Sequence, residues 1–417
     1  MNLFFINQGV GSLAAFALLA APLMANELHV GSDRTHKTIS SALAAASTND
    51  TIVVHAGRYA EGTLVINKTL SLIGNDSPVL DGKSKDEVLT IIAPNVSVRG
   101  FRIENGGRSS TKELAGIRVD STTGFSLTDN QLINCDYAIY LAKASKGDVT
   151  RNVIQGLTDQ EQNSGNGIHL WSSNAVRITD NKVSGHRDGI YLEFSSETNV
   201  EENQVEKNMR YGMHFMSSNN SHYRKNRFSR NGAGVAVMFS HHVEMTDNVF
   251  DYSWGSSAYG LLIKDLVDSH ITGNRFHHNS TAIYSQGATR TLFERNEFKA
   301  NGWALRVLSN GMENVFRNNN FVGNSFDVGT NGDLKDHTFA DNYWDRYEGY
   351  DLKHDGTGDV PFRPVGVYSM VTERVPASLF LMHSFMVQLL DRAEKAFPSI
   401  TPDSVIDPSP AMKPIAL

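Results

Sequence analysis

A histidine and two methionines have a spacing that could bind a soft metal ion. His214 and Met216 are two residues apart, and Met238 follows Met216 after 22 residues. Thioether sulfur and imidazole nitrogen are ligands that suit Cu(I), whereas hard cations prefer carboxylate oxygen. Glu193 precedes Met216 by 23 residues and would flank the same place. These side chains can meet only if the chain repeats with a period of about 22 residues. Whether they form a metal site therefore depends on the elements that carry them.

The chain does repeat with this period. A unit of the form Gly-apolar-x-apolar, a polar turn, and then an apolar segment with one Asn recurs, for example from Gly189 to Asn203 and from Gly212 to Asn226. The in-phase asparagines are Asn130, Asn152, Asn181, Asn203, Asn226, Asn248, Asn274, Asn296, Asn319 and Asn342. The apolar pieces alternate as strands do and have no helical period. Strands this short must stack on copies of themselves, which predicts an all-β fold, a right-handed parallel β-helix.

Equivalent positions of neighbouring coils then form columns along the stack. We expect the asparagines to form a ladder at a bend, where Asn bonds to backbone and tolerates a left-handed φ. The position two residues after each Asn is phenylalanine in the later coils, which predicts an internal aromatic stack. These phenylalanines are Phe228, Phe250, Phe276, Phe298 and Phe321.

Strand alternation also predicts which side chains leave the core. In the strand after each repeat Gly, the residues two and four positions on should point to solvent. The first column is His169, Tyr191, His214, Ala236 and Leu262, and the second is Trp171, Glu193, Met216, Met238 and Lys264. His214, Met216 and Met238 should therefore cluster on one face, either as a Cu(I) site or as an apolar docking patch that contains methionine.

A second outward column contains His222, Glu244 and His270, with His241 and His242 nearby. Histidine and glutamate in this arrangement could hold Cu or Zn. Ordinary solvated surface histidines are the simpler interpretation. The sole cysteine, Cys135, is expected to be a small buried residue in a turn.

The ends of the chain differ from the repeat, and four segments are expected. Residues 1–25 are predicted to be a signal peptide for the general secretory route, and residues 26–345 form the β-helix, whose open N-terminal end a short helix near 37–46 covers. An acidic, glycine-rich closing segment spans 346–375, and 376–417 form a helix over 377–397 and an extended proline-rich tail. The helix is too short to span a bilayer and presents a candidate partner-docking set. Its members are Leu379, Phe380, Met382, Phe385, Met386, Leu389 and Leu390. With a net charge of −7 and no basic cluster, the chain is a poor candidate for binding nucleic acid.

Several runs of sequence resemble the NosD family of periplasmic maturation proteins, whose coils are of the carbohydrate-binding and sugar-hydrolase (CASH) type. These runs are Gly165–Ser172, Arg187–Ser195, Met209–Ser217, Asn342–Asp351 and Leu389–Arg392. The resemblance implies a periplasmic, non-enzymatic protein that helps to assemble the copper–sulfide cluster of nitrous oxide reductase. It implies an ABC-type permease and its ATPase as partners, with membrane association through the permease, and a copper chaperone as metal donor. Copper would be bound transiently as Cu(I) at His214, Met216 and Met238, with Glu193 tuning the site, and no cofactor would be permanent. The segment 377–397 would dock onto the permease.

Two other classes of function stay open on the sequence. A periplasmic polysaccharide lyase or C5-epimerase would use the same fold and would need carboxylates clustered with Arg or Lys. The outward columns show no such cluster of carboxylates, although loops could supply one. A passive adhesin or scaffold would bind no copper.

Overall fold

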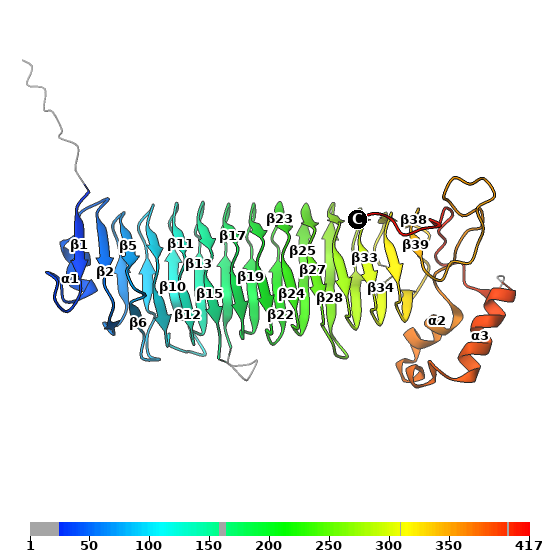
Figure 1. Ribbon diagram of the computed structural model, residues 1–417, viewed down its shortest axis with the longest axis horizontal. Helices are drawn as coiled ribbons and strands as arrows, with labels where there is room; N and C mark the ends of the chain where they lie inside the picture. The colour runs from blue at the N-terminus through cyan, green and yellow to red at the C-terminus, as the bar shows by residue number, and fades with distance from the viewer. Residues whose placement is uncertain (1–24, 158–163, 309, 398–399) are drawn as a thin grey trace, which may run out of the picture.

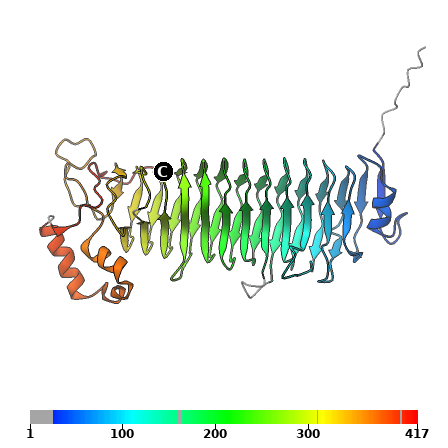
Figure 2. The ribbon, with the colours of Figure 1, turned by 180° about the vertical axis from the view of Figure 1, so that it is seen from behind.

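The chain winds into a right-handed parallel β-helix, as the repeat predicted (Figure 1). The computed structural model describes residues 25–157, 164–308, 310–397 and 400–417. Three parallel sheets of 14, 12 and 13 strands run the length of the stack, and each coil contributes one strand to each sheet over most of it. Seen from behind, the coils form one long column with helices at its two ends (Figure 2). The expected signal peptide lies outside the described residues except for Ala25.

The strands are short, and most have three to six residues. The 14-stranded sheet contains β1 Glu27–Val30, β2 Thr51–Val54, β5 Ser71–Gly74, β8 Ser97–Arg99, β11 Ser126–Thr128, β14 Asp148–Thr150, β17 Arg177–Thr179, β20 Asn199–Glu201, β23 Ser221–Arg224, β26 Val243–Thr246, β29 His270–Thr272, β32 Leu292–Glu294, β35 Val315–Arg317 and β38 Thr338–Ala340. The 12-stranded sheet contains β4 Leu64–Ile66, β7 Leu89–Ile91, β10 Ala115–Asp120, β13 Tyr137–Ala142, β16 Asn166–Trp171, β19 Asp188–Glu193, β22 Tyr211–Met216, β25 Ala233–His241, β28 Tyr259–Val267, β31 Thr281–Gln286, β34 Trp303–Val307 and β37 Phe326–Gly329. The 13-stranded sheet contains β3 Arg58–Tyr59, β6 Val79–Asp81, β9 Arg102–Glu104, β12 Gln131–Ile133, β15 Val153–Gln155, β18 Lys182–Ser184, β21 Gln204–Glu206, β24 Arg227–Ser229, β27 Val249–Asp251, β30 Arg275–His277, β33 Glu297–Lys299, β36 Asn320–Val322 and β39 Tyr343–Trp344.

A short helix covers the N-terminal end of the stack, as expected. Helix α1 spans Ile39–Ala45 and begins after Thr38, whose side chain accepts a hydrogen bond from the Ser41 amide. The Glu61 carboxylate accepts from the amides of Ile39 (2.8 Å) and Ser40 (2.9 Å). These bonds satisfy amides that a helix leaves free at its first turn. Ile39 and Ala42 are buried, so the apolar face of α1 seals the open core.

The asparagine column forms a continuous ladder inside the stack. In a typical step, the Asn203 amide and Nδ2 both donate to Oδ1 of Asn226, at 3.0 and 2.9 Å. All ten ladder asparagines are at most 1% exposed. We predicted a left-handed φ on the Asn itself. It lies instead on the residue before each Asn, for example 56° at Glu202 and 54° at Lys225. The reason is geometric: the preceding residue makes the bend, and the Asn after it points inward to bond the next coil.

The expected aromatic stack is present and ends on Trp344. Consecutive rings from Phe228 to Phe321 lie 4.6–5.5 Å apart, and the Phe321 and Trp344 centroids lie 4.0 Å apart. A second stack of Phe293, Phe316 and Phe339, with centroids 4.5 and 4.6 Å apart, was not predicted. Cys135 is buried as expected, and burial raises the pKa of its thiol to about 12.

The C-terminal segment forms two helical pieces where one helix was expected over 377–397, and a further helix precedes them in the closing segment. Helix α2 spans Val367–Arg374, the 3₁₀ helix η2 spans Pro376–Leu381, and α3 spans Phe385–Ala396. The predicted helix is interrupted because Ser384 caps a new one: its hydroxyl accepts from the Val387 amide at 3.4 Å. The helices gather at the far end of the column from α1 (Figure 1).

The proline-rich tail is extended, as expected, and turns back along the stack (Figure 1). Its buried Asp407 meets the last member of the asparagine ladder. Oδ2 of Asp407 accepts from the Asn342 amide (3.1 Å), Asn342 Nδ2 (3.0 Å) and Trp344 Nε1 (3.0 Å). Further along, Ile415 exchanges two backbone-to-side-chain hydrogen bonds with Asn320, at 2.8 and 2.9 Å. The tail therefore closes the C-terminal end of both the ladder and the aromatic stack.

Candidate functional site

The strand register brings the predicted metal ligands together on the outer face of the 12-stranded sheet. Met216 on β22 pairs directly with Met238 on β25, and Glu193 on β19 pairs with Met216. Neighbours at paired positions are about 4.8 Å apart along the stack. Met213 and Phe215 belong to the core. His214 and Met216 alternate with them along the strand and therefore share the outer face. We call His214, Met216 and Met238 the methionine patch.

His214 is not open to solvent, contrary to our prediction for its column. It is 6% exposed, and His169, Tyr191, Ala236 and Leu262 of the same column are also buried. These side chains leave the core but cover one another. The His214 ring stacks on Tyr191 with centroids 4.6 Å apart and an angle of 16°, and it contacts Tyr211 at 5.1 Å. Both ring nitrogens are buried, and neither has a hydrogen-bond partner among the residues that the structure describes. A buried nitrogen without a partner is unusual and calls for a ligand or a cost in stability.

A buried ion pair lies beside His214. Asp188 is fully buried and accepts two hydrogen bonds from Arg210, at 3.0 and 2.5 Å. Its Oδ2 lies 3.6 Å from Nδ1 of His214, a contact that is electrostatic because it exceeds hydrogen-bond length. Burial alone would raise the pKa of Asp188, but the neighbouring His214 and Arg210 outweigh it and lower that pKa. A carboxylate beside a ring nitrogen is the arrangement that orients metal-binding histidines through their second nitrogen.

The same column continues toward the N-terminus as a stack of rings that the sequence did not predict. His169 lies between Tyr140 and Tyr191, with centroids 4.8 and 4.7 Å away, and its Nδ1 is 3.3 Å from Asn166 Nδ2. Burial lowers the pKa of His169 to about 3, so the ring is neutral at physiological pH. The sequence did contain a signal for this stack. Rings occupy one position of three adjacent coils, at His169, Tyr191 and His214, and rings at such positions must stack.

Glu193 pairs with Met216 in the register and also faces the coil before it. Its Oε2 lies 3.9 Å from Nε2 of His169, toward the preceding coil. Two phenylalanines directly follow outward residues of this column, Phe194 after Glu193 and Phe239 after Met238. Phe194 and Phe239 are 55% and 57% exposed and hold left-handed φ values of 51° and 52°. Bulky residues rarely adopt this conformation, and here it presents an apolar rim beside Met216 and Met238.

Comparison with known proteins assigns the chain to a family. A family model described as "Periplasmic copper-binding protein (NosD)" matches residues 150–349, a range that contains the methionine patch. A protein of Pseudomonas aeruginosa named "Probable ABC transporter binding protein NosD" is 33% identical over 377 residues, covering 86% of this chain and 87% of the relative. A protein of the same name from Stutzerimonas stutzeri is 29% identical over 378 residues, covering 86% of each chain.

This chain belongs to the NosD family.

Solved structures share the fold of this NosD-family chain. The surface adhesin PfbA of Streptococcus pneumoniae superposes with a TM-score of 0.57 at 12% identity, covering 70% of this chain and 87% of PfbA. The A-module of the mannuronan C-5 epimerase AlgE6 of Azotobacter vinelandii gives 0.51 at 14% identity, covering 73% and 86%. At such low identity the likeness extends to the fold alone.

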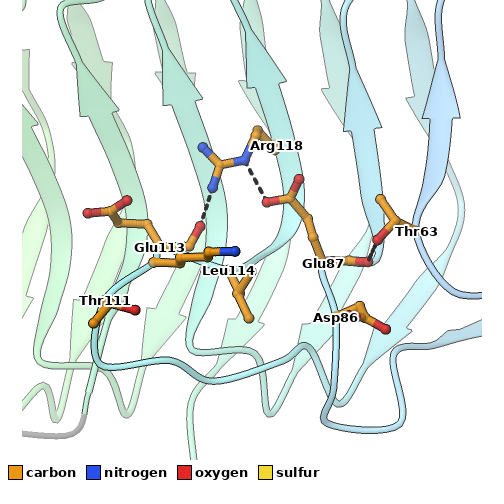
Figure 3. A pocket seen from close by; sticks show the side chains of 8 residues that line it. Thr63, Asp86, Glu87, Thr111, Glu113, Leu114 and Arg118 are labelled. Atoms are coloured by element: carbon orange, nitrogen blue, oxygen red, sulfur yellow. Dashed lines mark hydrogen bonds and ion pairs between the residues drawn. The ribbon is translucent and has the colours of Figure 1, made fainter.

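One shallow depression on the 12-stranded sheet bears on the enzymatic alternative. It is lined by Thr63, Glu87, Glu113 and Arg118, among others (Figure 3). Nε of Arg118 donates to the Glu87 carboxylate at 2.5 Å, and the guanidinium also donates to the Glu113 carbonyl. The Arg and Glu here neutralise each other, so the pair is poorly placed for acid–base work on a uronate.

The predicted docking residues of the NosD-family chain divide into two groups. Met382 and Leu390 are partly buried against a cluster of Trp303, Phe326, Tyr368 and Val387. The exposed members are Leu379, Phe380, Phe385, Met386 and Leu389, of which Phe380 is 94% and Phe385 76% exposed. Arg306 on β34 binds Glu373 on α2 with two hydrogen bonds of 2.9 and 2.6 Å. The buried group and this ion pair hold the helices on the sheet and leave the exposed group outward.

Two kinds of feature are absent from the part of the chain that the structure describes. No three His, Cys, Asp or Glu side chains in them already converge on a common metal position. Among the helices described, none has the length and apolar character that crossing a membrane requires.

Proposed function

We propose that this chain is a periplasmic accessory protein that receives Cu(I) and, with an ABC-type permease and its ATPase, helps to assemble the copper–sulfide cluster of nitrous oxide reductase. A copper chaperone would supply the metal. Copper is cargo in this proposal, so its site needs to release the ion as well as to bind it. The description of the matching family as periplasmic and copper-binding, and the ABC transporter named for the relatives, support the proposal.

The observation that carries it is the register pairing of Met216 with Met238 beside His214. Two thioethers and one imidazole form a soft donor set that discriminates against hard cations. The imidazole is buried, and its Nε2 has no hydrogen-bond partner among the described residues, whereas Nδ1 faces Asp188 at 3.6 Å. A copper ion would therefore satisfy Nε2. The ion enters from the methionine side, where both thioethers belong to partly exposed residues.

A competition titration with a chromophoric Cu(I) chelator tests the site. The variant Met216→Leu/Met238→Leu keeps the side-chain volume, which limits its cost in stability to below about 1.5 kcal/mol. We expect its Cu(I) affinity to fall by more than tenfold, roughly the effect of losing about 1.4 kcal/mol of binding energy. The matched control is Met312→Leu, because Met312 is an exposed methionine outside the patch. Equal affinity in wild type and the double variant would refute the Cu(I) site.

His214 is tested separately because it is buried. His214→Phe should keep the stack on Tyr191 and Tyr211, since an aromatic ring remains between them. We expect weaker Cu(I) binding with little change in the unfolding transition. An unchanged affinity in His214→Phe would reduce the site to the two thioethers.

The exposed apolar group of the C-terminal helices is the surface proposed to dock onto the permease. Removing the chain after Val375 is a poor test because it also removes Asp407, which closes the asparagine ladder. The sharper variant is Phe380→Glu/Phe385→Glu, at two side chains that contribute little to the fold because they are exposed. Leu352→Glu, at a 73% exposed apolar residue of the closing segment, is the control. We expect only the double variant to lose co-purification with the transporter, and its retention would disprove this docking surface.

The amount of copper–sulfide cluster assembled in the reductase tests both the methionine patch and the proposed docking surface in the cell. Expressed in a strain lacking the gene, the Met216→Leu/Met238→Leu and Phe380→Glu/Phe385→Glu variants should leave the reductase without its copper–sulfide cluster, measured by its visible absorption. Full cluster content with both variants would show that the protein acts in another way.

A further inference from the structure

A second group of metal-ligating side chains lies around the corner from the methionine patch, on the 14-stranded sheet. Three successive coils bring together four of the 15 histidines of the chain and two carboxylates. We call this group the imidazole patch. Its members are His222, His241, His242, Glu244, Asp268 and His270.

The strand register places these residues side by side. Glu244 on β26 pairs with His222 on β23 and with His270 on β29, so the three side chains form one outward column. His241 ends β25, which continues past the sheet corner and pairs there with Val267. All four histidines and Glu244 are exposed. The three members of this column are therefore about 4.8 Å apart along the stack.

Two pairs of donor atoms are already close. Nδ1 of His241 lies 2.8 Å from Nδ1 of His242, and Nδ1 of His222 lies 3.0 Å from Oε2 of Glu244. Two nitrogens bound at about 2.0–2.1 Å to a tetrahedral ion are about 3.3 Å apart, so a small rotation opens the first pair onto a metal. The backbone at this corner is held in place, since the His241 amide donates to Asn219 Oδ1 at 3.0 Å and the His242 amide to the Val267 carbonyl at 3.1 Å.

The carboxylates of the imidazole patch are not equivalent. Asp268 accepts two hydrogen bonds from Arg290, at 2.6 and 2.9 Å, so its carboxylate is already occupied by this ion pair. Glu244 has only the contact with His222 among the hydrogen bonds described for its side chain. The donor set for a metal is therefore imidazole with one carboxylate, and it contains no thioether.

We propose that the imidazole patch binds a borderline divalent transition-metal ion, Zn²⁺ or Cu²⁺. His241 and His242 provide the preset pair, and exposed His222, Glu244 or His270 rotate in to complete the coordination. Imidazole and carboxylate ligands suit these ions, whereas the thioethers of the methionine patch suit Cu(I). The proposal does not depend on the Cu(I) site. The two patches are nevertheless close along the chain, because Met238 of one and His241 of the other are three positions apart on β25.

The test uses the full mature chain, prepared without a polyhistidine tag and titrated with Zn²⁺ against a chromophoric chelator. We expect one ion per chain, and a loss in His241→Ala/His242→Ala larger than the roughly 10–100-fold that removal of an outer partner of a metal site causes. The matched control is His277→Gln/His278→Gln, an adjacent histidine pair on the 13-stranded sheet, where Nε2 of His277 faces Glu297 at 3.4 Å. The control should bind as wild type does.

A spectroscopic arm with Cu²⁺ identifies the ligands. Electron paramagnetic resonance of the Cu²⁺-loaded protein should show nitrogen hyperfine splitting in wild type and in Met216→Leu/Met238→Leu. In His241→Ala/His242→Ala, which keeps His222 and His270, the splitting should come from fewer nitrogens. Equal Zn²⁺ affinity in wild type and His241→Ala/His242→Ala, or an equal loss in the His277/His278 control, would overturn the proposal. Loss of Cu(I) binding in the methionine variant with Zn²⁺ binding intact would support both sites independently.

Discussion

Removal of the Asp407 side chain should open the C-terminal end of the stack. This residue comes from the tail, yet it occupies the position that the next asparagine of the ladder would take. One oxygen, Oδ2, accepts three hydrogen bonds, from the Asn342 amide, Asn342 Nδ2 and Trp344 Nε1, at 3.0–3.1 Å. The Asp407 backbone is also paired, in both directions, with Phe362. The ladder and the Trp344 ring therefore end on a single buried carboxylate.

The size of the effect follows from these three donors. A buried donor left without a partner costs about 1–3 kcal/mol. The costs do not add fully, because Asp407→Ala leaves a space into which water can enter. We expect about 3–5 kcal/mol, which is less than the full sum for three unsatisfied donors. Asp407→Asn keeps one oxygen for the three donors but turns an amide toward the Ser409 N–H, which Oδ1 now accepts at 3.1 Å. It should cost about 1–3 kcal/mol, the penalty of one unsatisfied donor.

Hydrogen exchange localises the loss. In a stacked fold each coil contacts mainly its neighbours, so Asp407→Ala should reduce amide protection at 338–344 and 405–411 and leave coils near α1 unchanged. Asp403→Ala is the control, because Asp403 is an exposed carboxylate of the same tail. Protection unchanged at 338–344, or lost uniformly along the whole column, would show that Asp407 does not close the ladder.

Three further predictions concern other sites. The pKa of His169 is lowered to about 3 from an unfolded value near 6.5, so the stability that its neutral ring contributes is complete above pH 6.5 and is lost as the pH falls toward 3. Urea unfolding at pH 7 and pH 4 measures this loss, and His169→Phe should remove at most about 3 kcal/mol of it. Cys135, with a pKa of about 12, should react with a thiol reagent only after denaturation, and rapid labelling of the native protein would contradict this. Glu373→Gln should weaken the bidentate bond to Arg306 and raise hydrogen exchange in α2 while Cu(I) affinity stays the same, whereas unchanged exchange in α2 would count against this tether.

The sequence predicted the fold because the β-helix is encoded locally and repeatedly. Each coil carries its own Asn and apolar alternation, and a period near 22 residues determines which residues become neighbours. The pairing of Met216 with Met238 follows from that period alone. The burial of His214 does not, because it depends on how the rings of Tyr191 and Tyr211 pack, and an alternating pattern indicates only the direction in which a side chain leaves the strand.

The C-terminal features could not be predicted for a different reason. Asp407 lies 65 residues after Asn342 and outside the repeat, so no periodicity assigns it to the ladder. The apolar run over 377–397 was recognised, but its interruption at Ser384 depends on a single capping bond that competes with continued helix. Long-range closure and local capping of this kind are decided by tertiary contacts.

The methionine patch lies on the same 12-stranded sheet against which the C-terminal helices pack, which constrains how these two surfaces work together. Helix α2 lies against β37, and the helices pack on Trp303 of β34, whereas Met238 lies on β25. From β25 to β34 the sheet order passes through β28 and β31, three steps of about 4.8 Å, or about 14 Å along the stack. This spacing is kept by ladders of buried hydrogen bonds on each coil, so it cannot change without breaking them. A permease bound to the exposed group of the helices would thus lie close to the copper cargo but not on it. A donor of copper would still have access to the methionine patch from the side, past Phe194 and Phe239.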